Sequence, residues 1–193
     1  MGTTKKSKSR SKTRERILQA AGQVIIDQGV QALTLDAVAK KAEVSKGGLL
    51  YYFPNKNALI VNLGEQLLQN FNTSVEQEFE LDDAPNTPGQ YLRAYVRSTE
   101  KMSKETLALF ARLLFIFAEM PPEAFPSFEA YENKWFQRIE NDGIDPIQAR
   151  IIQLAIDGLW FSEILEMGVP TEDKRAQIVE SLLQMASSVS KTD

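Results

Sequence analysis

Two residue types are missing from this chain of 193 residues, which contains no cysteine and no histidine. Without cysteine, disulfide bonds and thiolate metal sites are excluded. Without histidine, the chain lacks the commonest general base, the commonest zinc ligand and any Ser–His or Cys–His nucleophile pair. A pair of catalytic carboxylates is the formal alternative, but the sequence singles out none. We therefore expect a protein that is not an enzyme and that holds no metal and no cofactor.

Long hydrophobic runs are also missing. Crossing a bilayer takes about 20 consecutive apolar residues, and no segment approaches that length. The first residues are polar and basic, unlike a secretory signal. Hydrophobic residues make up 43% of the chain and charged residues 25%, which is ordinary for a folded soluble protein. These features predict a cytoplasmic protein without a membrane partner.

Acidic residues are scarce in the first third of the chain and abundant in the rest. Residues 1–60 contain eleven lysines and arginines against four acidic residues, whereas residues 61–193 contain eleven against twenty-two. A basic front and an acidic back indicate that only the front meets a polyanion. The alternative interpretation is a basic tail that only aids solubility.

Strand patterns are absent as well, because no long stretch alternates apolar and polar residues. Apolar residues instead recur at helical spacing between loops rich in proline, glycine and aspartate. We predict an all-α fold with a disordered basic arm over 1–11, a helix-turn-helix domain over 12–56 and a larger helical domain over 57–193. About nine helices are expected, over residues 12–28, 35–41, 46–52, 56–79, 91–102, 104–119, 127–141, 146–167 and 172–188.

The run TLDAVAKKAEVSKGGLLYYF, residues 34–53, predicts two short helices joined by a tight turn. Thr34 and Ser45 are residue types that cap helix N-termini. Small Ala39 and Ala42 let the two helices cross closely. This arrangement is typical of a helix-turn-helix, whose second helix enters the major groove of DNA.

The second helix of this motif carries residues suited to contact DNA. Lys46 is able to donate to a guanine edge or a phosphate, and the hydroxyls of Tyr51 and Tyr52 reach phosphate oxygens. Gly47 and Gly48 each cost about 1 kcal/mol of helix stability but allow the backbone to approach DNA closely. The alternatives are a merely loosened turn and tyrosines that serve packing. We expect one tyrosine to pack beneath the helix and the other to point outward.

Residues 13–60 resemble the DNA-binding domain of the TetR family of bacterial transcriptional regulators. The resemblance rests on RERILQAAGQVIIDQG and on TLDAVAKKAEVSKGGLLYYFPNKNAL. It implies an all-helical, homodimeric repressor whose C-terminal domain, residues 57–193, binds a small effector and dimerises. By position it assigns phosphate contacts to Thr34, Tyr51, Tyr52 and Lys56, and base-edge contacts to Lys46, Gly47, Gly48 and Leu50.

The sequence departs from the family at three places. Glu43 occupies the turn position usually given to glycine, so it must adopt an unfavourable backbone conformation or shift the turn. Leu50 stands where tyrosine is frequent, which removes a hydrogen bond to DNA. Tyrosines also replace the histidine that family members usually have among the aromatic residues at the end of the second helix. The DNA contacts of this chain are therefore expected to differ from those of its relatives.

The basic arm supplies further positive charge ahead of the motif. Such a segment fits an extension that tracks phosphates or enters the minor groove, and it makes affinity for DNA steeply dependent on salt. Its basic residues, with those that follow it, are Lys5, Lys6, Lys8, Arg10, Lys12, Arg14 and Arg16.

The acidic part of the chain is rich in aromatic residues. Most are expected in the core, but as a set they are suited to line a pocket for a flat hydrophobic ligand. Asp157 lies in LAIDGLWF among residues suited to burial, and a buried carboxylate needs a protein donor or a cationic ligand. The segment QLAIDGLWFSEILEMG resembles one in multidrug-sensing members, which favours a small hydrophobic, cationic effector. The candidate ligand-binding residues are Phe71, Met102, Phe110, Phe117, Tyr131, Trp135, Asp157, Trp160 and Phe161.

The last two predicted helices, 146–167 and 172–188, have broad apolar faces. In the TetR family such helices pair with their symmetry mates, which implies a homodimer through these segments. A two-fold dimer places two recognition helices on one side of DNA, so the operator should be roughly palindromic. The alternative is that these faces close the core of a monomer.

Three functions remain open on the sequence alone. The leading interpretation is a ligand-responsive repressor that leaves a palindromic operator when a small lipophilic effector binds. A DNA-architectural protein without an effector predicts weak sequence preference and no saturable ligand site. A small-molecule carrier or enzyme with an accessory helix-turn-helix is disfavoured by the missing histidine and cysteine.

Overall fold

Helices account for all the regular secondary structure in the residues that the structure describes. This computed structural model describes residues 3–119 and 126–188, without the side chains of residues 3–9, 118, 126–129 and 132. No strand occurs within these ranges, so the predicted all-α fold is confirmed, and none of their helices is long and apolar enough to cross a membrane. The elements are α1 (Thr3–Gln28), the 3-10 helix η1 (Val30–Ala32), α2 (Leu35–Lys41), α3 (Lys46–Tyr52), α4 (Lys56–Glu80), α5 (Gln90–Glu100), α6 (Lys104–Glu119), α7 (Pro126–Glu140), α8 (Pro146–Leu165) and α9 (Glu172–Ser187).

Local capping residues determine where several of these helices begin. The Thr34 hydroxyl accepts a hydrogen bond from the Ala37 amide at 3.1 Å, and the Ser45 hydroxyl accepts one from the Gly48 amide at 3.0 Å. The Asp145 carboxylate caps α8 in the same way, directly before a proline at the first helical position. Thr171 occupies the cap position of α9 but makes no side-chain capping bond. The predicted starts of α2, α3 and α8 are therefore confirmed.

The predicted disordered arm is wrong for the described backbone, because α1 begins at Thr3 rather than near residue 12. Thr13, a residue type that often caps a helix N-terminus, lies inside this helix. The arm lacks apolar periodicity, but lysine and arginine are good helix formers and no glycine or proline occurs between Thr3 and Ala21. A helix already nucleated by its packed half therefore extends through the basic segment, since each further residue adds a hydrogen bond at little cost.

The described residues divide into two compact units. The first comprises residues 3–67 and 108–119, and the second comprises residues 68–107 and 126–188. Two helices, α4 and α6, contribute residues to both. The predicted interruption at 120–126 lies almost entirely outside the described residues.

The first unit has an aliphatic core to which α1, α2, α3, α4 and α6 all contribute. Its fully buried members include Ile17, Leu18, Ile25, Leu33, Val38, Leu49, Leu59 and Leu113. The Arg112 guanidinium of α6 donates to the carbonyl oxygens of Ile25 and Ile26 at 3.1 and 2.8 Å. These carbonyls lie in the last turn of α1, where they lack partners within the helix. Arg112 therefore ties α6 to the end of α1.

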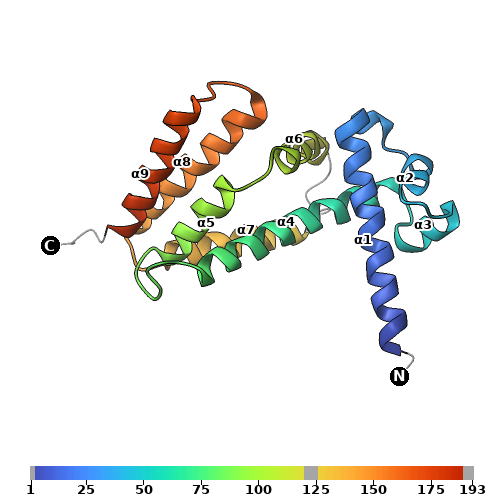
Figure 1. The fold of residues 1–193 in the computed structure, drawn as a ribbon, viewed down its shortest axis with the longest axis horizontal. Helices are drawn as coiled ribbons and strands as arrows, with labels where there is room; N and C mark the ends of the chain where they lie inside the picture. Colours follow the sequence, from blue (N-terminus) through green and yellow to red (C-terminus); the bar gives the residue numbers. More distant parts are fainter. Residues whose placement is uncertain (1–2, 120–125, 189–193) are drawn as a thin grey trace. The chain divides into compact units, whose positions relative to one another are not determined.

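The second unit is built around α5, which contacts α7, α8 and α9. Figure 1 shows α8 and α9 side by side and antiparallel, joined by a short loop. The N-terminus of α5 is capped from a distance, because the Asp142 carboxylate accepts hydrogen bonds from the amides of Tyr91 and Leu92 at 3.0 and 2.7 Å. Burial raises the pKa of Asp142 above its ordinary value, and these amide bonds oppose the rise without cancelling it.

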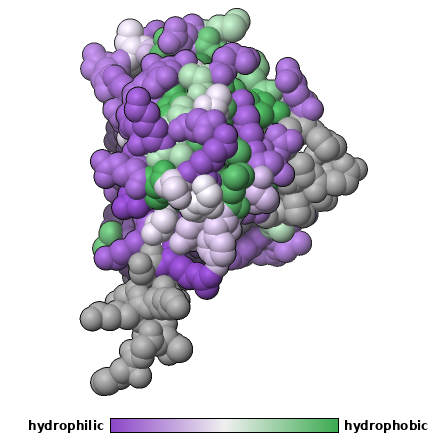
Figure 2. All heavy atoms as spheres, turned by 90° about the vertical axis from the view of Figure 1, so that its right-hand side faces the viewer, coloured by the Kyte–Doolittle hydropathy of each residue, from purple (hydrophilic) through white to green (hydrophobic). Residues whose placement is uncertain are grey.

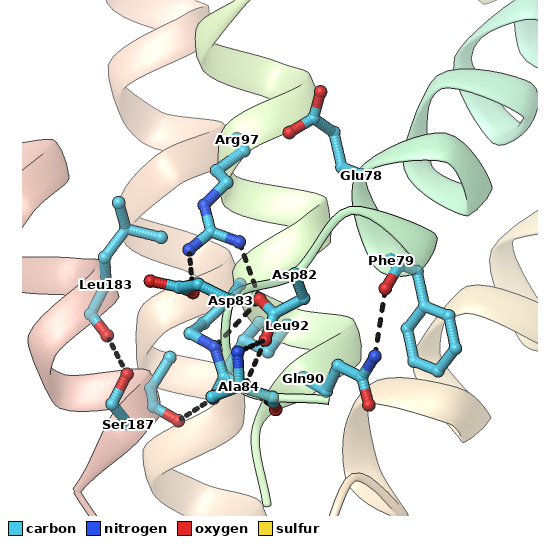
Figure 3. Close-up of polar contacts among 12 residues, drawn as sticks. Glu78, Phe79, Asp82, Asp83, Ala84, Gln90, Leu92, Arg97, Leu183 and Ser187 are labelled. Atoms are coloured by element: carbon cyan, nitrogen blue, oxygen red, sulfur yellow. Dashed lines mark hydrogen bonds and ion pairs between the residues drawn. The ribbon is translucent and has the colours of Figure 1, made fainter. Parts of the chain in front are cut away.

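A buried ion pair fastens the loop between α4 and α5 (Figure 3). The Asp82 carboxylate, which has no exposed side-chain surface, lies 2.7 Å from Arg93 Nη2 and 2.6 Å from Arg97 Nη1. Arg93 also donates to the Ala84 carbonyl at 3.1 Å. Burial alone would raise the pKa of Asp82, but the hydrogen bonds from Arg93, the Ala84 amide and Arg97 outweigh it and hold that pKa below its ordinary value.

Candidate DNA interface and effector site

The turn between α2 and α3 brings these two helices into the arrangement that the sequence predicts. Ala42 is buried at the end of α2, and its amide donates to Val38 at 2.8 Å. Glu43 adopts a left-handed conformation with φ 52°, the unfavourable backbone expected where glycine is usual. The Val44 amide then bonds to the Ala39 carbonyl at 3.0 Å. Buried Leu49 holds α3 on the core of the first unit.

The outer surface of α3 combines exposed polar and apolar residues. Lys46 and Gly47 are exposed, as are Leu50 and Tyr51, whose exposed fractions are 39% and 62%. Tyr52 is half-buried against the core, which confirms that one tyrosine packs and the other points outward. Figure 2 looks onto the end of the first unit that carries α2 and α3. Hydrophilic residues cover most of that face, with paler and hydrophobic groups between them.

The two glycines of α3 are there for different reasons. A Cβ added to Gly47 would meet nothing within 4 Å, so its absence leaves the backbone open to an approaching molecule. A Cβ added to Gly48 would lie 3.1 Å from the Ser45 hydroxyl, which caps the helix. Gly48 therefore has a structural reason to be small, whereas Gly47 has no such reason within the chain.

Two features of this surface were not apparent from the sequence. Lys46 Nζ lies 2.9 Å from a carboxylate oxygen of Asp36, and both side chains are exposed. The Arg10 guanidinium lies over the Tyr51 ring, 5.1 Å from its centroid, and Arg14 lies over the Phe53 ring at 5.6 Å. The basic segment of α1 is thus in contact with α3. Only apolar residues at helical spacing in the arm could have indicated this contact. The arm contains no such pattern.

The remaining two predicted DNA contacts lie at helix starts. Thr34 is exposed, but its hydroxyl already accepts the capping bond of α2. Lys56 is half-buried and is the first residue of α4, where amides without helical partners are available to an anion. An Asn55 side-chain oxygen takes one of those amides, from Ala58, at 2.8 Å.

In the second unit, four aromatic side chains from three helices form a cluster. The ring of Phe71 on α4 lies 5.5 Å from that of Tyr95 on α5 and 5.3 Å from that of Trp135 on α7, and both pairs are edge-to-face. Tyr131 lies 5.9 Å from Trp135. The Trp135 indole N–H donates to the Asn72 side-chain oxygen at 3.2 Å. We call Phe71, Tyr95, Tyr131 and Trp135 the aromatic cluster.

Asp157 of α8 joins this cluster through Tyr95. The Tyr95 hydroxyl donates to one carboxylate oxygen at 3.0 Å, and the Gln153 side-chain amide donates to the other. The sequence left two kinds of partner open for Asp157, a protein donor or a cationic ligand. Protein donors are thus present. Both partners were missed. Tyr95 reaches Asp157 only through the packing of α5 against α8, whereas Gln153 lies four residues before Asp157 on α8, a helical spacing that could have indicated it.

Two family descriptions match this chain. Residues 17–63 match the bacterial regulatory proteins of the tetR family, and residues 89–187, just over half of the chain, match the tetracyclin repressor-like C-terminal domain. The chain belongs to the TetR family.

Individual TetR-family relatives match it to different extents. The regulator RutR of Escherichia coli (strain K12) is 32% identical over 53% of this chain and 47% of its own. The regulator YvdT of Bacillus subtilis (strain 168) is 43% identical over 28% of each chain. The regulator BetI of Stenotrophomonas maltophilia (strain R551-3) is 29% identical over 86% of this chain and 88% of its own. The chain thus spans less than half of the length of RutR and about a quarter of that of YvdT.

Solved structures share the TetR-family fold over nearly the whole chain. A TetR-family member from Streptomyces coelicolor A3 covers 90% of this chain and 97% of its own, with a TM-score of 0.64 and 21% identity. The multidrug binding protein EbrR, in complex with ethidium, covers 90% of this chain and 98% of its own, with a TM-score of 0.63 and 22% identity. At such identities the likeness concerns the fold.

The nine predicted ligand-binding residues do not form one group in this TetR-family chain. Phe71, Tyr131, Trp135 and Asp157 gather at the aromatic cluster. The Trp160 indole N–H donates to the Met102 sulfur at 3.2 Å, and the Phe161 ring packs on Trp160 at 5.0 Å. Phe110 and Phe117 belong to the first unit, where Phe117 packs against the aliphatic core and lies close to Gly64.

Proposed function

We propose that this chain is a ligand-responsive transcriptional repressor that binds a roughly palindromic operator as a homodimer and leaves it when a small lipophilic effector binds. The observation that carries the proposal is α3, which is capped and anchored by its inner residues while Lys46, Gly47, Leu50 and Tyr51 are exposed on its outer side. A helix presented in this way after a tight turn is the recognition element of helix-turn-helix proteins.

Within that proposal, phosphate and base contacts come from different parts of the surface. Thr34, Tyr51, Tyr52 and Lys56 bind phosphates, which fix the position of the protein on the duplex, and Lys46, Gly47, Gly48 and Leu50 face base edges. Lys46 must exchange its Asp36 partner for DNA. Because both side chains of that ion pair are more than half exposed to water, releasing it costs little. Arg10, which lies over Tyr51, adds a guanidinium beside the phosphate contact.

The proposed effector is a small, flat, hydrophobic cation that binds at the aromatic cluster. Aromatic faces attract cations, and the Asp157 carboxylate beside Tyr95 adds a negative charge. EbrR, which shares the fold, is a multidrug binding protein whose complexes include ethidium and malachite green. Both compounds are aromatic cations, so they are suitable first probes for this chain.

The proposed dimer forms through α8 and α9. Ile147, Ile151 and Leu154 follow one another at helical spacing along α8 with exposed fractions of 70%, 54% and 58%. Ile178 and Met185 of α9 are each 38% exposed. A second copy of the same chain covers such a stripe, because a two-fold interface pairs identical surfaces. Ile152, Ile156, Leu159 and Val179 face inward and close the core of the second unit instead.

Effector and operator are linked in this proposal by helices shared between the two units. Helix α4 begins in the first unit and ends in the second, and α6 does the reverse. An effector that binds more tightly to the conformation unable to hold DNA would displace the protein from its operator by an amount set by that difference in affinity.

Selection of bound sequences from a genomic DNA pool, with and without cationic dyes, tests the proposal. We expect enrichment of a palindrome by the protein alone and loss of that enrichment when an effector is added. Binding without a palindrome would favour a DNA-architectural protein. A palindrome that every dye leaves bound, together with thermal shifts only from anionic compounds, would refute the effector class but keep the operator.

A Tyr51→Phe variant tests the assignment of contacts on α3. The ring and its Arg10 contact remain, but the phenolic donor is lost, so affinity should fall by about five- to tenfold, equally for all operator variants. Tyr91→Phe, in the second unit and outside the aromatic cluster, is the matched control and should leave DNA binding unchanged. The two are compared by fluorescence anisotropy at one fixed salt concentration, because affinity depends on salt.

A further inference from the structure

Gln153 on α8 has a buried oxygen that no group in the described chain satisfies. The residue is only 3% exposed, and its side-chain oxygen Oε1 is buried without a hydrogen-bond partner. The other end of the same amide, Nε2, donates to the Asp157 carboxylate. Leaving a buried acceptor unpaired destabilises the folded chain, so the retention of this acceptor calls for a reason.

Rotation of the amide does not relieve this cost. A carboxylate only accepts hydrogen bonds, so Asp157 must face the Nε2 donor and not Oε1. The Tyr95 hydroxyl donates to the other oxygen of Asp157 at 3.0 Å, which holds that carboxylate in place. The three side chains therefore fix Oε1 as a buried acceptor that is satisfied only when another molecule brings a donor to it.

This acceptor belongs to the same part of the second unit as the aromatic cluster. Tyr95, the partner of Asp157, lies edge-on to Phe71 and within 6.5 Å of the Trp135 ring. The helix of Gln153 and Asp157 packs against both α5 and α7, which supply Tyr95 and Trp135. Aromatic faces, a carboxylate and an unpaired carbonyl oxygen thus occur together, and each of them suits a cation that carries N–H groups.

We propose that Gln153 is a specificity-determining residue of the effector site, which selects flat aromatic cations bearing primary or secondary amino groups over the same cations with fully alkylated nitrogens. The inference rests on the proposed effector site and narrows its ligand class. An N–H group of the effector donates to Gln153 Oε1. A dialkylated nitrogen offers no such donor and leaves Oε1 unpaired in the complex.

The test uses two triarylmethane cations with the same core. Pararosaniline carries three NH₂ groups, and crystal violet carries three N(CH₃)₂ groups in their place. Dissociation constants are measured by equilibrium dialysis for the wild type and for Gln153→Met, which keeps the length of the side chain and removes the acceptor. Gln137→Met, an exposed glutamine on α7 of the same unit, is the matched control.

We expect the ratio of the two dissociation constants to shift by about tenfold against pararosaniline in Gln153→Met and to stay unchanged in Gln137→Met. Comparing this ratio between the wild type and a variant cancels the effects of the different size and hydrophobicity of the two dyes. The wild-type measurement does not depend on any variant, and circular dichroism confirms that each variant is folded.

The outcomes separate this inference from the function beneath it. If both dyes bind and the ratio is the same in Gln153→Met, an ordered water satisfies Oε1, and the inference is overturned while the cationic effector stands. If neither dye binds at concentrations up to about 1 mM, both the effector class and the inference are overturned. A tenfold shift confined to Gln153→Met supports both.

Discussion

The Asp82 carboxylate illustrates how much depends on one buried charge. Its side chain and that of Arg93 are 0% and 3% exposed, and they form two hydrogen bonds, from Nε at 3.1 Å and from Nη2 at 2.7 Å. Such a pair is not by itself a large source of stability, because both charges lose their hydration. Removing only one partner is costly, since the other charge remains buried without compensation.

Replacing Asp82 by asparagine should therefore destabilise the protein far more than the same change at Asp83. Asp82→Asn leaves the Arg93 guanidinium buried without a counter-charge, with an expected loss of about 3–5 kcal/mol of unfolding free energy. Asp83 is 85% exposed and its ion pair with Arg97 lies at the surface, so Asp83→Asn should cost less than about 1 kcal/mol. Urea unfolding at equal protein concentration measures both, and similar losses would contradict the buried-pair interpretation.

The lowered pKa of Asp82 predicts how the difference in stability between wild type and Asp82→Asn depends on pH. Below its ordinary value of 3.8 the unfolded chain takes up a proton at this site before the folded chain does. The stability that Asp82 contributes is thus fully present above that value and is lost as the pH falls through the folded pKa. The difference between wild type and Asp82→Asn should be constant from neutral pH to about pH 5 and should shrink in acid.

At the scale of the helices, the sequence predicted those helix starts that residues close together in the chain determine. Thr34, Ser45 and Asp145 cap the helices that follow them, and each bond spans three residues. The capping of α5 by Asp142 spans 50 residues and the Tyr95–Asp157 bond spans 62, so no local pattern indicates them. The position of α3 and its exposed side was therefore predictable, whereas the contact of Tyr95 with Asp157 depended on tertiary packing.

The turn between α2 and α3 carries strain that a single change should relieve. Glu43 has φ 52°, a conformation that costs a residue with a side chain about 1–2 kcal/mol. Glu43→Gly should therefore raise the unfolding free energy by about 1 kcal/mol, after allowing for the greater freedom of glycine in the unfolded chain. Thermal unfolding measures the gain.

Lys40→Gly is the control for that gain, because Lys40 is an exposed residue with ordinary helical backbone inside α2. There glycine relieves nothing and should cost about 1 kcal/mol. A loss of stability in both variants would show that Glu43 is not strained.

At the scale of the whole molecule, the apolar stripe on α8, formed by Ile147, Ile151 and Leu154, is the feature that most strongly indicates a binding partner. Three aliphatic side chains at successive turns are each more than half exposed, a pattern that core packing within one chain does not explain. Under the proposed two-fold symmetry each stripe meets its own copy, so one substitution alters the interface twice. Two like charges placed there would be brought together and removed from water at the same time.

Leu154→Glu should consequently weaken the dimer, raising its dissociation constant by at least about 100-fold, since two buried carboxylates together cost several kcal/mol. Leu81→Glu is the matched control, because Leu81 is 76% exposed but follows α4 instead of lying on the stripe. Light scattering across a dilution series should find Leu154→Glu monomeric where the wild type and Leu81→Glu are dimeric. Operator affinity should fall with the loss of the dimer, because a single recognition helix then binds each half-site alone. A Leu154→Glu protein that is still dimeric at the lowest concentration would move the interface elsewhere on the chain.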